Sequence, residues 1–301
     1  MAIKARDQVK WVESSKTLEL EADTGEAFLV KNVIEQGATS GYITISINKT
    51  TVGYFRVDWS DLGSHLRFPM EDSDKVTILD YLYKQGIFKG YPVAEGETFL
   101  VSAPNNELIA VIYDIYEPGD ISPDMENGSE ATEYMLINYG RAASSGTLAE
   151  GDNVYDTSML PAEFPEFPFG KDVPAKTRID IYGILASDVA NTTGSGANKQ
   201  NTQYLKFIKE REVLFDEDKR GLPIMGVPAS SDVLRVGTGF SVVGNYSSID
   251  KRLPYMFSEP LSFNAGEELG IIVNTKVAAG SANIDVELAE VAVIEKIIKT
   301  G

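Results

Sequence analysis

The side chains that most often carry catalysis are scarce in this chain of 301 residues. It contains no Cys and a single His, His65. Without Cys there is no thiol nucleophile, redox pair or Cys-ligated zinc site, and one His cannot form a multi-histidine metal centre. His65 and Asp61 could act as general base and orienting acid for a remote Ser, but no GxSxG-like turn accompanies them. We therefore interpret His65 as a loop or strand-edge residue.

Carboxylates are the one abundant chemical group. The chain has 45 Asp and Glu against 27 Lys and Arg, a formal net charge of −18. Glycoside hydrolysis needs only two carboxylates at a suitable separation. Glu163 with Glu166, or Asp114 with Glu117, would satisfy that requirement, yet nothing selects either pair among so many acids. We expect no catalytic residues and no enzymatic activity.

One turn-rich segment is a candidate calcium site. Hard cations prefer carboxylate and carbonyl oxygens, and five acids gather there: Asp114, Glu117, Asp120, Asp124 and Glu126. The spacing of an EF-hand is absent, and a solvated acidic loop explains the same residues more simply. Because Gly237-Thr238-Gly239 also lacks the third glycine and following helix of a phosphate-binding loop, we expect no cofactor, with Ca²⁺ as the one candidate.

The charge of the chain restricts its partners. An acidic surface repels nucleic-acid phosphate, so we expect no direct contact with nucleic acid. The first ten residues are mildly basic, with Lys4, Arg6 and Lys10 offset by Asp7, and we interpret them as a flexible solvated end. No run of about 18 apolar residues and no apolar leader is present. We therefore expect either a protein that stays where it is made or a mature form.

Alternation of apolar and polar residues predicts β-strands through most of the chain. Residues 42–47 and 52–57 flank a short polar turn and predict a hairpin. Short runs rich in Val, Ile, Tyr and Phe predict further strands at residues 17–20, 28–34, 98–101, 108–116, 134–139, 178–185, 204–208, 233–236, 240–243, 269–273 and 284–294. Residues 72–85 instead have the spacing of one short helix, with Asp72 or Ser73 as N-cap and Gly86 as its stop.

A weak internal repeat joins the two parts of the chain. Residues 92–101 and 260–271 both run from Pro through a Gly-Glu pair into an alternating strand, although the Pro-to-Gly spacing differs. Each could be the closing hairpin of an antiparallel sandwich, and chance recurrence of a common turn sequence is the alternative. The Gly, Pro and Asp residues of segment 117–129 are typical of a linker.

These patterns predict an all-β protein built as an antiparallel β-sandwich of jelly-roll type. We predict two sandwich units, residues 1–121 with the short helix and residues 122–301 with long loops. One sandwich with a large insertion is the alternative.

A proline-rich segment in the second part is a candidate contact between subunits. Proline removes backbone donors, so this segment cannot be a central strand, and its phenylalanines must be covered by the protein's own surface or by a neighbour. We predict that a subunit interface includes Phe164, Pro165, Phe167, Pro168 and Phe169.

Three stretches carry a resemblance to a known family. They are residues 110–120 (AVIYDIYEPGD), 127–134 (NGSEATEY) and 137–140 (INYG). They resemble capsid proteins of tailless icosahedral viruses of archaea and thermophilic bacteria, whose shells have upright jelly-roll units and enclose an internal membrane. The resemblance implies a virion structural protein, made in the host cytoplasm, whose partners are copies of itself, other capsid proteins, and an internal membrane or a host surface glycan.

Two other functions remain open from the sequence. A carbohydrate-binding or adhesion β-sandwich would need exposed aromatic residues to stack on sugar rings, and Trp11 and Trp59 are the only tryptophans. We expect both to be buried or half-buried instead. A glycosidase with an acid pair is the third function considered.

Overall fold

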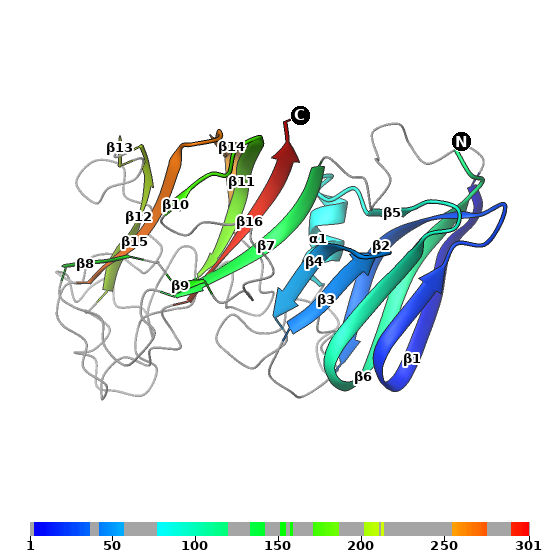
Figure 1. Ribbon diagram of the computed structural model, residues 1–301. Helices are drawn as coiled ribbons and strands as arrows, with labels where there is room; N and C mark the ends of the chain where they lie inside the picture. Colours follow the sequence, from blue (N-terminus) through cyan, green and yellow to red (C-terminus); the bar gives the residue numbers. More distant parts are fainter. Residues whose placement is uncertain are drawn as a thin grey trace. The chain divides into compact units, whose positions relative to one another are not determined.

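The computed structural model describes residues 3–36, 42–56, 77–119, 133–141, 151–154, 157–158, 171–186, 202–210, 212–213, 255–275 and 290–300. The chain forms two compact units, the first ending at Ile137 and the second running from Asn138 to Gly301 (Figure 1). Strand pairing gives unit 1 β1–β6 with α1, and unit 2 β7–β16. The boundary predicted at residues 121 and 122 stays a prediction, because residues 120–132 lie outside the described residues.

Unit 1 contains the following elements: β1 (Ile3–Glu21), β2 (Ala27–Gln36), β3 (Tyr42–Ile47), β4 (Thr50–Arg56), α1 (Ile78–Lys84), β5 (Tyr91–Val93) and β6 (Thr98–Tyr116). Unit 2 contains β7 (Glu133–Arg141), β8 (Gly151–Val154), β9 (Thr157–Ser158), β10 (Lys171–Asp172), β11 (Thr177–Ala186), β12 (Thr202–Lys209), β13 (Glu212–Val213), β14 (Tyr255–Phe263), β15 (Glu268–Thr275) and β16 (Glu290–Lys299). The strand pairings whose register is described are antiparallel.

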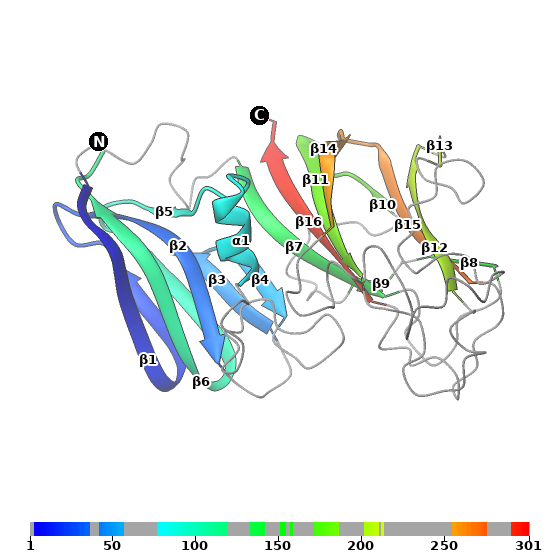
Figure 2. The same ribbon diagram turned by 180° about the vertical axis from the view of Figure 1, so that it is seen from behind.

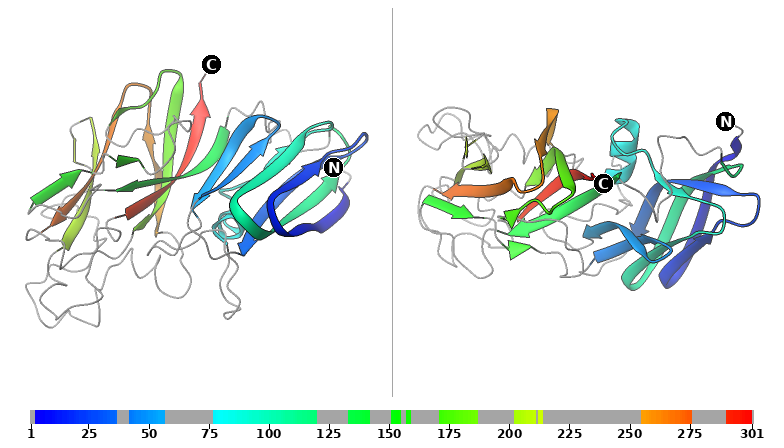
Figure 3. Two further views of the ribbon diagram at one scale, coloured as in Figure 1. Left: turned by 60° about the horizontal axis from the view of Figure 1, so that its bottom comes forward. Right: turned by 45° about the horizontal axis from the view of Figure 1, so that its top comes forward.

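Two long strands shape unit 1. β1 and β6 pair along their whole length, from Ile3 opposite Tyr116 to Glu21 opposite Thr98. The register shifts between Val12 and Thr17, and the two strands curl over together (Figures 1 and 3). Each strand therefore serves two layers, because its halves lie on either side of the bend.

The order of strands around this bend is that of a jelly roll. One layer runs from the first half of β1 through the second half of β6 to β2 and β5. The other layer runs from the second half of β1 through the first half of β6 to β3 and β4. Eight strand segments thus form two four-stranded layers. The predicted fold class, an antiparallel β-sandwich of jelly-roll type, is confirmed.

Alternating side chains fill the space between the layers. Ile43, Ile45 and Ile47 of β3 are fully buried, as are Phe99 and Val101 of β6. Successive side chains of a strand point to opposite faces, so the alternation noted in the sequence places these residues inside. Fully burying one such side chain contributes about 1.5–3 kcal/mol. The interior of unit 1 is a packed core.

The helix α1 of unit 1 lies beside β2 (Figure 2). It begins at Ile78, with Thr77 as N-cap accepting a hydrogen bond from the Asp80 amide, so the predicted N-caps Asp72 and Ser73 are wrong. Thr77 also donates a hydrogen bond to Asn32 of β2, with 2.6 Å between the oxygens. The helix ends at the predicted place. Among the described residues, no helix is long and apolar enough to span a membrane.

Unit 2 repeats the strand order of unit 1. One sheet of unit 2 has the strand order β7, β16, β11, β14. These strands correspond in turn to the first half of β1, the second half of β6, β2 and β5. The other sheet has the strand order β10, β15, β12, β13. These strands correspond in turn to the second half of β1, the first half of β6, β3 and β4. β8 pairs with β15 on the same side as β10, whereas β9 is an addition beside β7.

The Gly-Glu repeat of the sequence is the same turn in both units. In unit 1 the amide of Gly96 donates to the Ala22 carbonyl (2.8 Å) and the Ala22 amide to the Glu97 carbonyl (3.0 Å). In unit 2 the amide of Gly266 donates to the Val173 carbonyl (2.8 Å), and the Val173 amide donates to the Glu267 carbonyl (2.9 Å). Gly96 and Gly266 have φ values of 80° and 82°, a conformation that favours glycine.

A β-bulge also recurs at the same place. The pairing of β2 with β6 shifts between Val30 and Asn32, and the pairing of β11 with β16 shifts between Ile181 and Gly183. Lys31 and Tyr182 therefore occupy equivalent bulge positions. A bulge is a specific feature of a fold, so its recurrence, together with the turn, shows that the units share one architecture in detail.

The turn after β3 repeats as well. Asn48 and Glu210 both have positive φ, 53° and 50°. The Asn48 amide donates to the Thr98 carbonyl, and the Thr98 amide donates back to the Asn48 side chain at 3.0 Å. Glu210 and Glu268 make the same reciprocal pair in unit 2, with 3.1 Å for the side-chain bond.

Some sequence-based element assignments need correction. The first residues are not a flexible end, because Ile3–Lys10 belong to β1. The strands predicted at 98–101 and 108–116 are one strand, β6. Neither β5 nor β14 was predicted, and the strands predicted at 233–236 and 240–243 lie outside the described residues.

One buried hydroxyl in unit 1 has an unfavourable environment. Tyr91 is 4% exposed, and its hydroxyl has no hydrogen-bond partner within the described part of the chain. Burial raises the pKa of Tyr91, so the group stays neutral. We expect Tyr91→Phe to raise the free energy of unfolding by about 1 kcal/mol, because it removes an unpaired buried polar atom and keeps the ring between Phe88 and Phe99. Denaturant unfolding measures the change, and a loss of stability would reveal a partner for the hydroxyl.

Candidate functional site

The first residue of the predicted calcium site is already engaged within the protein. Asp114 lies on β6 with 5% of its surface exposed. Its Oδ1 atom accepts hydrogen bonds from the Asp7 amide at 2.8 Å and contacts Lys31 Nζ at 2.7 Å. Glu117 is exposed just after β6, and Asp120, Asp124 and Glu126 lie outside the described residues. Calcium binding stays a prediction, and the described residues contain no group of three metal-ligating side chains.

Most other predicted site residues also lie outside the described residues, and the predictions about them stay predictions. They are His65, Asp61, Trp59, Glu163, Glu166 and the proposed interface residues Phe164, Pro165, Phe167, Pro168 and Phe169.

A cluster of charged side chains joins the first half of β1 to β2 and β6. Lys31, at the β2 bulge, contacts Asp7 of β1 at 2.5 Å and Asp114 of β6 at 2.7 Å. The side chains of Lys31 and Asp114 are 13% and 8% exposed. Burial alone would lower the pKa of Lys31, but its hydrogen bonds to Asp114 and Asp7 outweigh burial and raise it. The hydrogen bond from Lys31 lowers the pKa of Asp7. This arrangement is structural, because the Lys31 ammonium pairs with the carboxylates of Asp7 and Asp114.

Unit 2 has a different pair at the equivalent positions. Lys296 of β16 corresponds to Asp114 in the register of the two units, and its Nζ atom lies 5.8 Å from the centre of the Tyr182 ring. A cation–π contact thus replaces an ion pair. The backbone geometry is the same, while the side chains that stabilise it differ.

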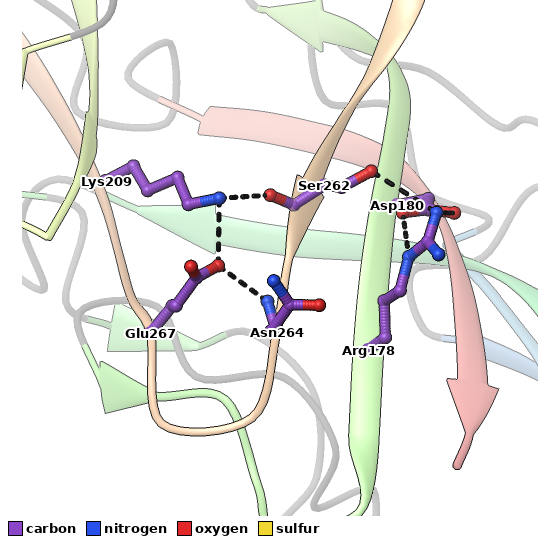
Figure 4. A network of polar contacts seen from close by, with 6 residues as sticks. All are labelled: Arg178, Asp180, Lys209, Ser262, Asn264 and Glu267. Carbon is purple, nitrogen blue, oxygen red and sulfur yellow. Dashed lines mark hydrogen bonds and ion pairs between the residues drawn. The ribbon is translucent and has the colours of Figure 1, made fainter.

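The Gly-Glu turn of unit 2 is the centre of a polar network (Figure 4). Glu267 Oε2 accepts a hydrogen bond from the Asn264 amide at 2.7 Å and contacts Lys209 Nζ at 2.9 Å. Lys209 also donates to the Ser262 carbonyl at 2.7 Å. The network joins the ends of β12 and β14 to the turn that precedes β15.

Beside it, Arg178 holds the buried carboxylate of Asp180 (Figure 4). The guanidinium donates to both carboxylate oxygens at 2.9 Å. Asp180 is 4% exposed, so the two-pronged contact compensates a charge that burial would otherwise disfavour. The Asp180 side chain is buried, whereas the side chains of Arg178, Lys209 and Glu267 are partly exposed at 44%, 29% and 25%.

Protonation of Glu267 should weaken unit 2. Burial alone would raise the pKa of Glu267, but the hydrogen bonds from Asn264 and Lys209 lower it below its ordinary value of 4.5. The resulting stabilisation is present above pH 4.5 and is lost as the pH falls through the lowered pKa. We expect Glu267→Gln to cost about 0.5–1 kcal/mol at pH 7, since solvent screens a partly exposed pair.

Thermal unfolding between pH 2 and 7 measures this effect. The difference between the native protein and Glu267→Gln should shrink toward the acidic end, and Lys209→Met should give a similar loss at pH 7. A difference that grows as the pH falls would mean that the Glu267 carboxylate is not stabilised in this way.

Among the described residues of unit 1, the most exposed large apolar side chains lie on β1. Val9 and Trp11 are each 57% exposed, and both stand on the face that carries Ala110 and Ile112 of β6. The expectation that Trp11 is buried or half-buried is therefore wrong. The backbone of Asp7 has a φ of 52°, which interrupts the alternation of apolar and polar residues. The sequence pattern therefore does not indicate that this segment is a strand.

Comparison with known proteins identifies no family. No family model matches the sequence, and no curated protein matches it. Among solved structures, the chain is similar to the major capsid protein P2 from bacteriophage PM2, with a TM-score of 0.40 and 8% identity over 98% of each chain.

Two other solved structures are similar to a lesser degree. A peptide-N(4)-(N-acetyl-β-D-glucosaminyl)asparagine amidase has a TM-score of 0.33 and 10% identity, with 97% of this chain and 96% of that chain covered. A Paenibacillus xanthan lyase has a TM-score of 0.19 and 12% identity, with 99% and 25% covered. At TM-scores below 0.5, the fold rests on the strand pairing of the two units and not on these likenesses.

Proposed function

We propose that this protein is a virion structural protein, a capsid subunit that assembles with copies of itself into an icosahedral shell and has no enzymatic activity. The observation that carries the proposal is the duplication of one jelly roll, with the same bulge and the same hydrogen-bonded turns, in a single chain. Jelly rolls are typical of viral capsid and lectin domains. A chain with two equivalent bodies supplies two equivalent building blocks to a regular surface.

The interior of unit 1 agrees with a structural role. Its two layers enclose large apolar side chains that are at most 1% exposed, including Phe55, Phe99 and Leu18. A packed sandwich provides a rigid body, whereas a jelly roll that binds a ligand inside needs a cavity with convergent polar groups. The net charge of −18 would keep unassembled subunits apart until salt or divalent cations screen it.

Light scattering of concentrated protein, with and without divalent cations, tests the proposal. We expect material many times heavier than the 32.9 kDa of one chain. A mass of one chain under all conditions would contradict a shell subunit.

The proline-rich segment gives a sharper test of the proposed interface. We expect deletion of residues 164–169 to leave both sandwiches folded and to abolish assembly, because the three phenylalanines would no longer reach a neighbouring subunit. Circular dichroism checks the fold and electron microscopy the particles. Normal particles from the deletion variant would place the contact elsewhere. The virion location and any contact with other capsid proteins or an internal membrane belong to the same proposal.

Carbohydrate binding is the second candidate, and the exposure of Trp11 favours it. An accessible indole ring is suited to stacking on a sugar. Clear signals on a glycan array, lost in Trp11→Ala and accompanied by a monomeric mass, would support this function over the first.

A further inference from the structure

The first half of β1 (residues 3–13) pairs with β6 but contributes no buried side chain to unit 1. Every side chain of β1 from Ile3 to Thr17 is exposed or half-buried, whereas Leu18 and Leu20 are 0% and 4% exposed. The equivalent strand of unit 2, β7, does reach the interior, since Met135 is 9% exposed. Detaching the first half of β1 would therefore withdraw no buried side chain from the core.

A short bend separates this half from the rest of β1. The pairing with β6 shifts between Val12 and Thr17, and Ser14 has a φ of 52°. A residue with a side chain adopts that backbone conformation only at a cost in free energy. The equivalent connection in unit 2 is much longer, because β7 ends at Arg141 and β10 begins at Lys171. A short and strained connection favours exchange of the strand that it carries.

The rest of unit 1 binds this half of β1 through specific contacts. Lys31 Nζ lies 2.5 Å from the Asp7 carboxylate, and Asp114 Oδ1 accepts a hydrogen bond from the Asp7 amide at 2.8 Å. Lys4 Nζ donates to the Gly25 carbonyl. The same segment of a second copy can make the same contacts, because it has the same groups in the same register. These contacts select that segment as the strand that the edge of β6 accepts.

We propose that in the assembled protein the first half of β1 leaves its own chain and pairs with β6 of a second copy, in the register that it has within one chain. The same hydrogen bonds and ion pairs form again, and only the bend at Ser14 changes. Extension of the bend relieves the backbone conformation of Ser14, which favours the exchanged form. The inference rests on the proposed function and deepens it, because it names the strand that links one subunit to another.

Crosslinking of single cysteines tests the exchange, because the chain has no Cys of its own. Trp11→Cys and Ala110→Cys are made in separate preparations, at positions that lie opposite each other in the pairing of β1 with β6. Opposite residues are close enough for a short bifunctional thiol reagent to join. The two folded proteins are mixed at an assembling concentration and treated with the reagent. Every crosslink between positions 11 and 110 then joins two chains, since each chain carries one thiol.

The matched control lies on the same pair of strands beyond the bend. Thr17→Cys and Ser102→Cys are also opposite each other, in the half of β1 that stays with its own chain. We expect peptide mapping by mass spectrometry to find roughly ten times more crosslinks between positions 11 and 110 than between positions 17 and 102. Equal yields from the two pairs would overturn the exchange.

Locking the strand within one chain gives the second test. Trp11→Cys and Ala110→Cys are combined in one chain and crosslinked in dilute solution, and the single-chain product is isolated. We expect association to require roughly ten times more protein than for the same variant treated with a monofunctional reagent. The same lock between Thr17→Cys and Ser102→Cys should leave association unchanged. Circular dichroism checks that both locked proteins are folded.

The outcomes separate the exchange from the proposed function. Particles that form from the chain locked between positions 11 and 110 at the ordinary protein concentration would overturn the exchange and leave the shell subunit standing. Abundant crosslinks between positions 11 and 110 in a species no larger than a dimer would support the exchange and contradict the shell.

Discussion

Phe99→Ala should lower the free energy of unfolding of unit 1 by about 3–5 kcal/mol. Phe99 lies in the first half of β6 with no exposed surface, and its ring centre is 5.7 Å from that of Tyr91. Removing the ring loses apolar burial and leaves a cavity between the two layers. Because β6 belongs to both layers, collapse around the cavity would disturb the pairing with β1 and β3 together.

Hydrogen exchange followed by mass spectrometry measures this effect in each unit. Phe263→Ala, at a fully buried position of unit 2, is the matched variant, and Val154→Ala is the exposed control. We expect Phe99→Ala to weaken protection in β1–β6 and Phe263→Ala to weaken it in β11, β14 and β16. A loss below 1 kcal/mol for Phe99→Ala would contradict a tightly packed core in unit 1.

Lys31→Met should cost unit 1 about 3 kcal/mol. The substitution keeps much of the apolar side chain but removes the cation that contacts both Asp7 and Asp114. Asp114, whose side chain is 8% exposed, would then hold a buried negative charge with only the Asp7 amide beside it. The first half of β1 should detach more readily, because the cluster joins β1 to β2 and β6.

A double-mutant cycle tests whether the buried charge is the cause. Asp114→Asn in the Lys31→Met background should recover much of the loss, since it removes the unpaired charge. Lys84→Met is the control, because Lys84 pairs with Asp80 at the surface and its side chain is 64% exposed. That variant should cost less than about 0.5 kcal/mol. Equal losses for Lys31→Met and Lys84→Met would contradict the role given to burial.

The sequence predicts the strands in which polar and apolar residues alternate without interruption. The hairpin of β3 and β4 is confirmed, because Ile43, Ile45 and Ile47 all point inward. The Gly-Glu repeat is also confirmed as one recurring turn, since Gly96 and Gly266 adopt the same positive φ. The prolines beside the two turns are not equivalent, which explains the difference in spacing noted in the sequence.

The same alternation does not predict strands that contain bulges. The bulge at Asp7 shifts the alternation of β1, so Ala5 falls out of phase with Val9 and Trp11. The ion pairs of Lys31 join residues far apart in the chain, and nothing local marks them. Exposure of Trp11 depends on which other elements pack against β1, and that is a property of the whole sheet and not of the residues beside Trp11 in the sequence.

Cryo-electron microscopy of the assembled protein tests most directly whether this chain is a shell subunit built from two jelly rolls. The account predicts closed particles in which every chain contributes two eight-stranded sandwiches of matching density, with the bulges of Lys31 and Tyr182 at equivalent positions. Dispersed single molecules at every protein and cation concentration, or particles in which only one sandwich per chain has that form, would contradict it.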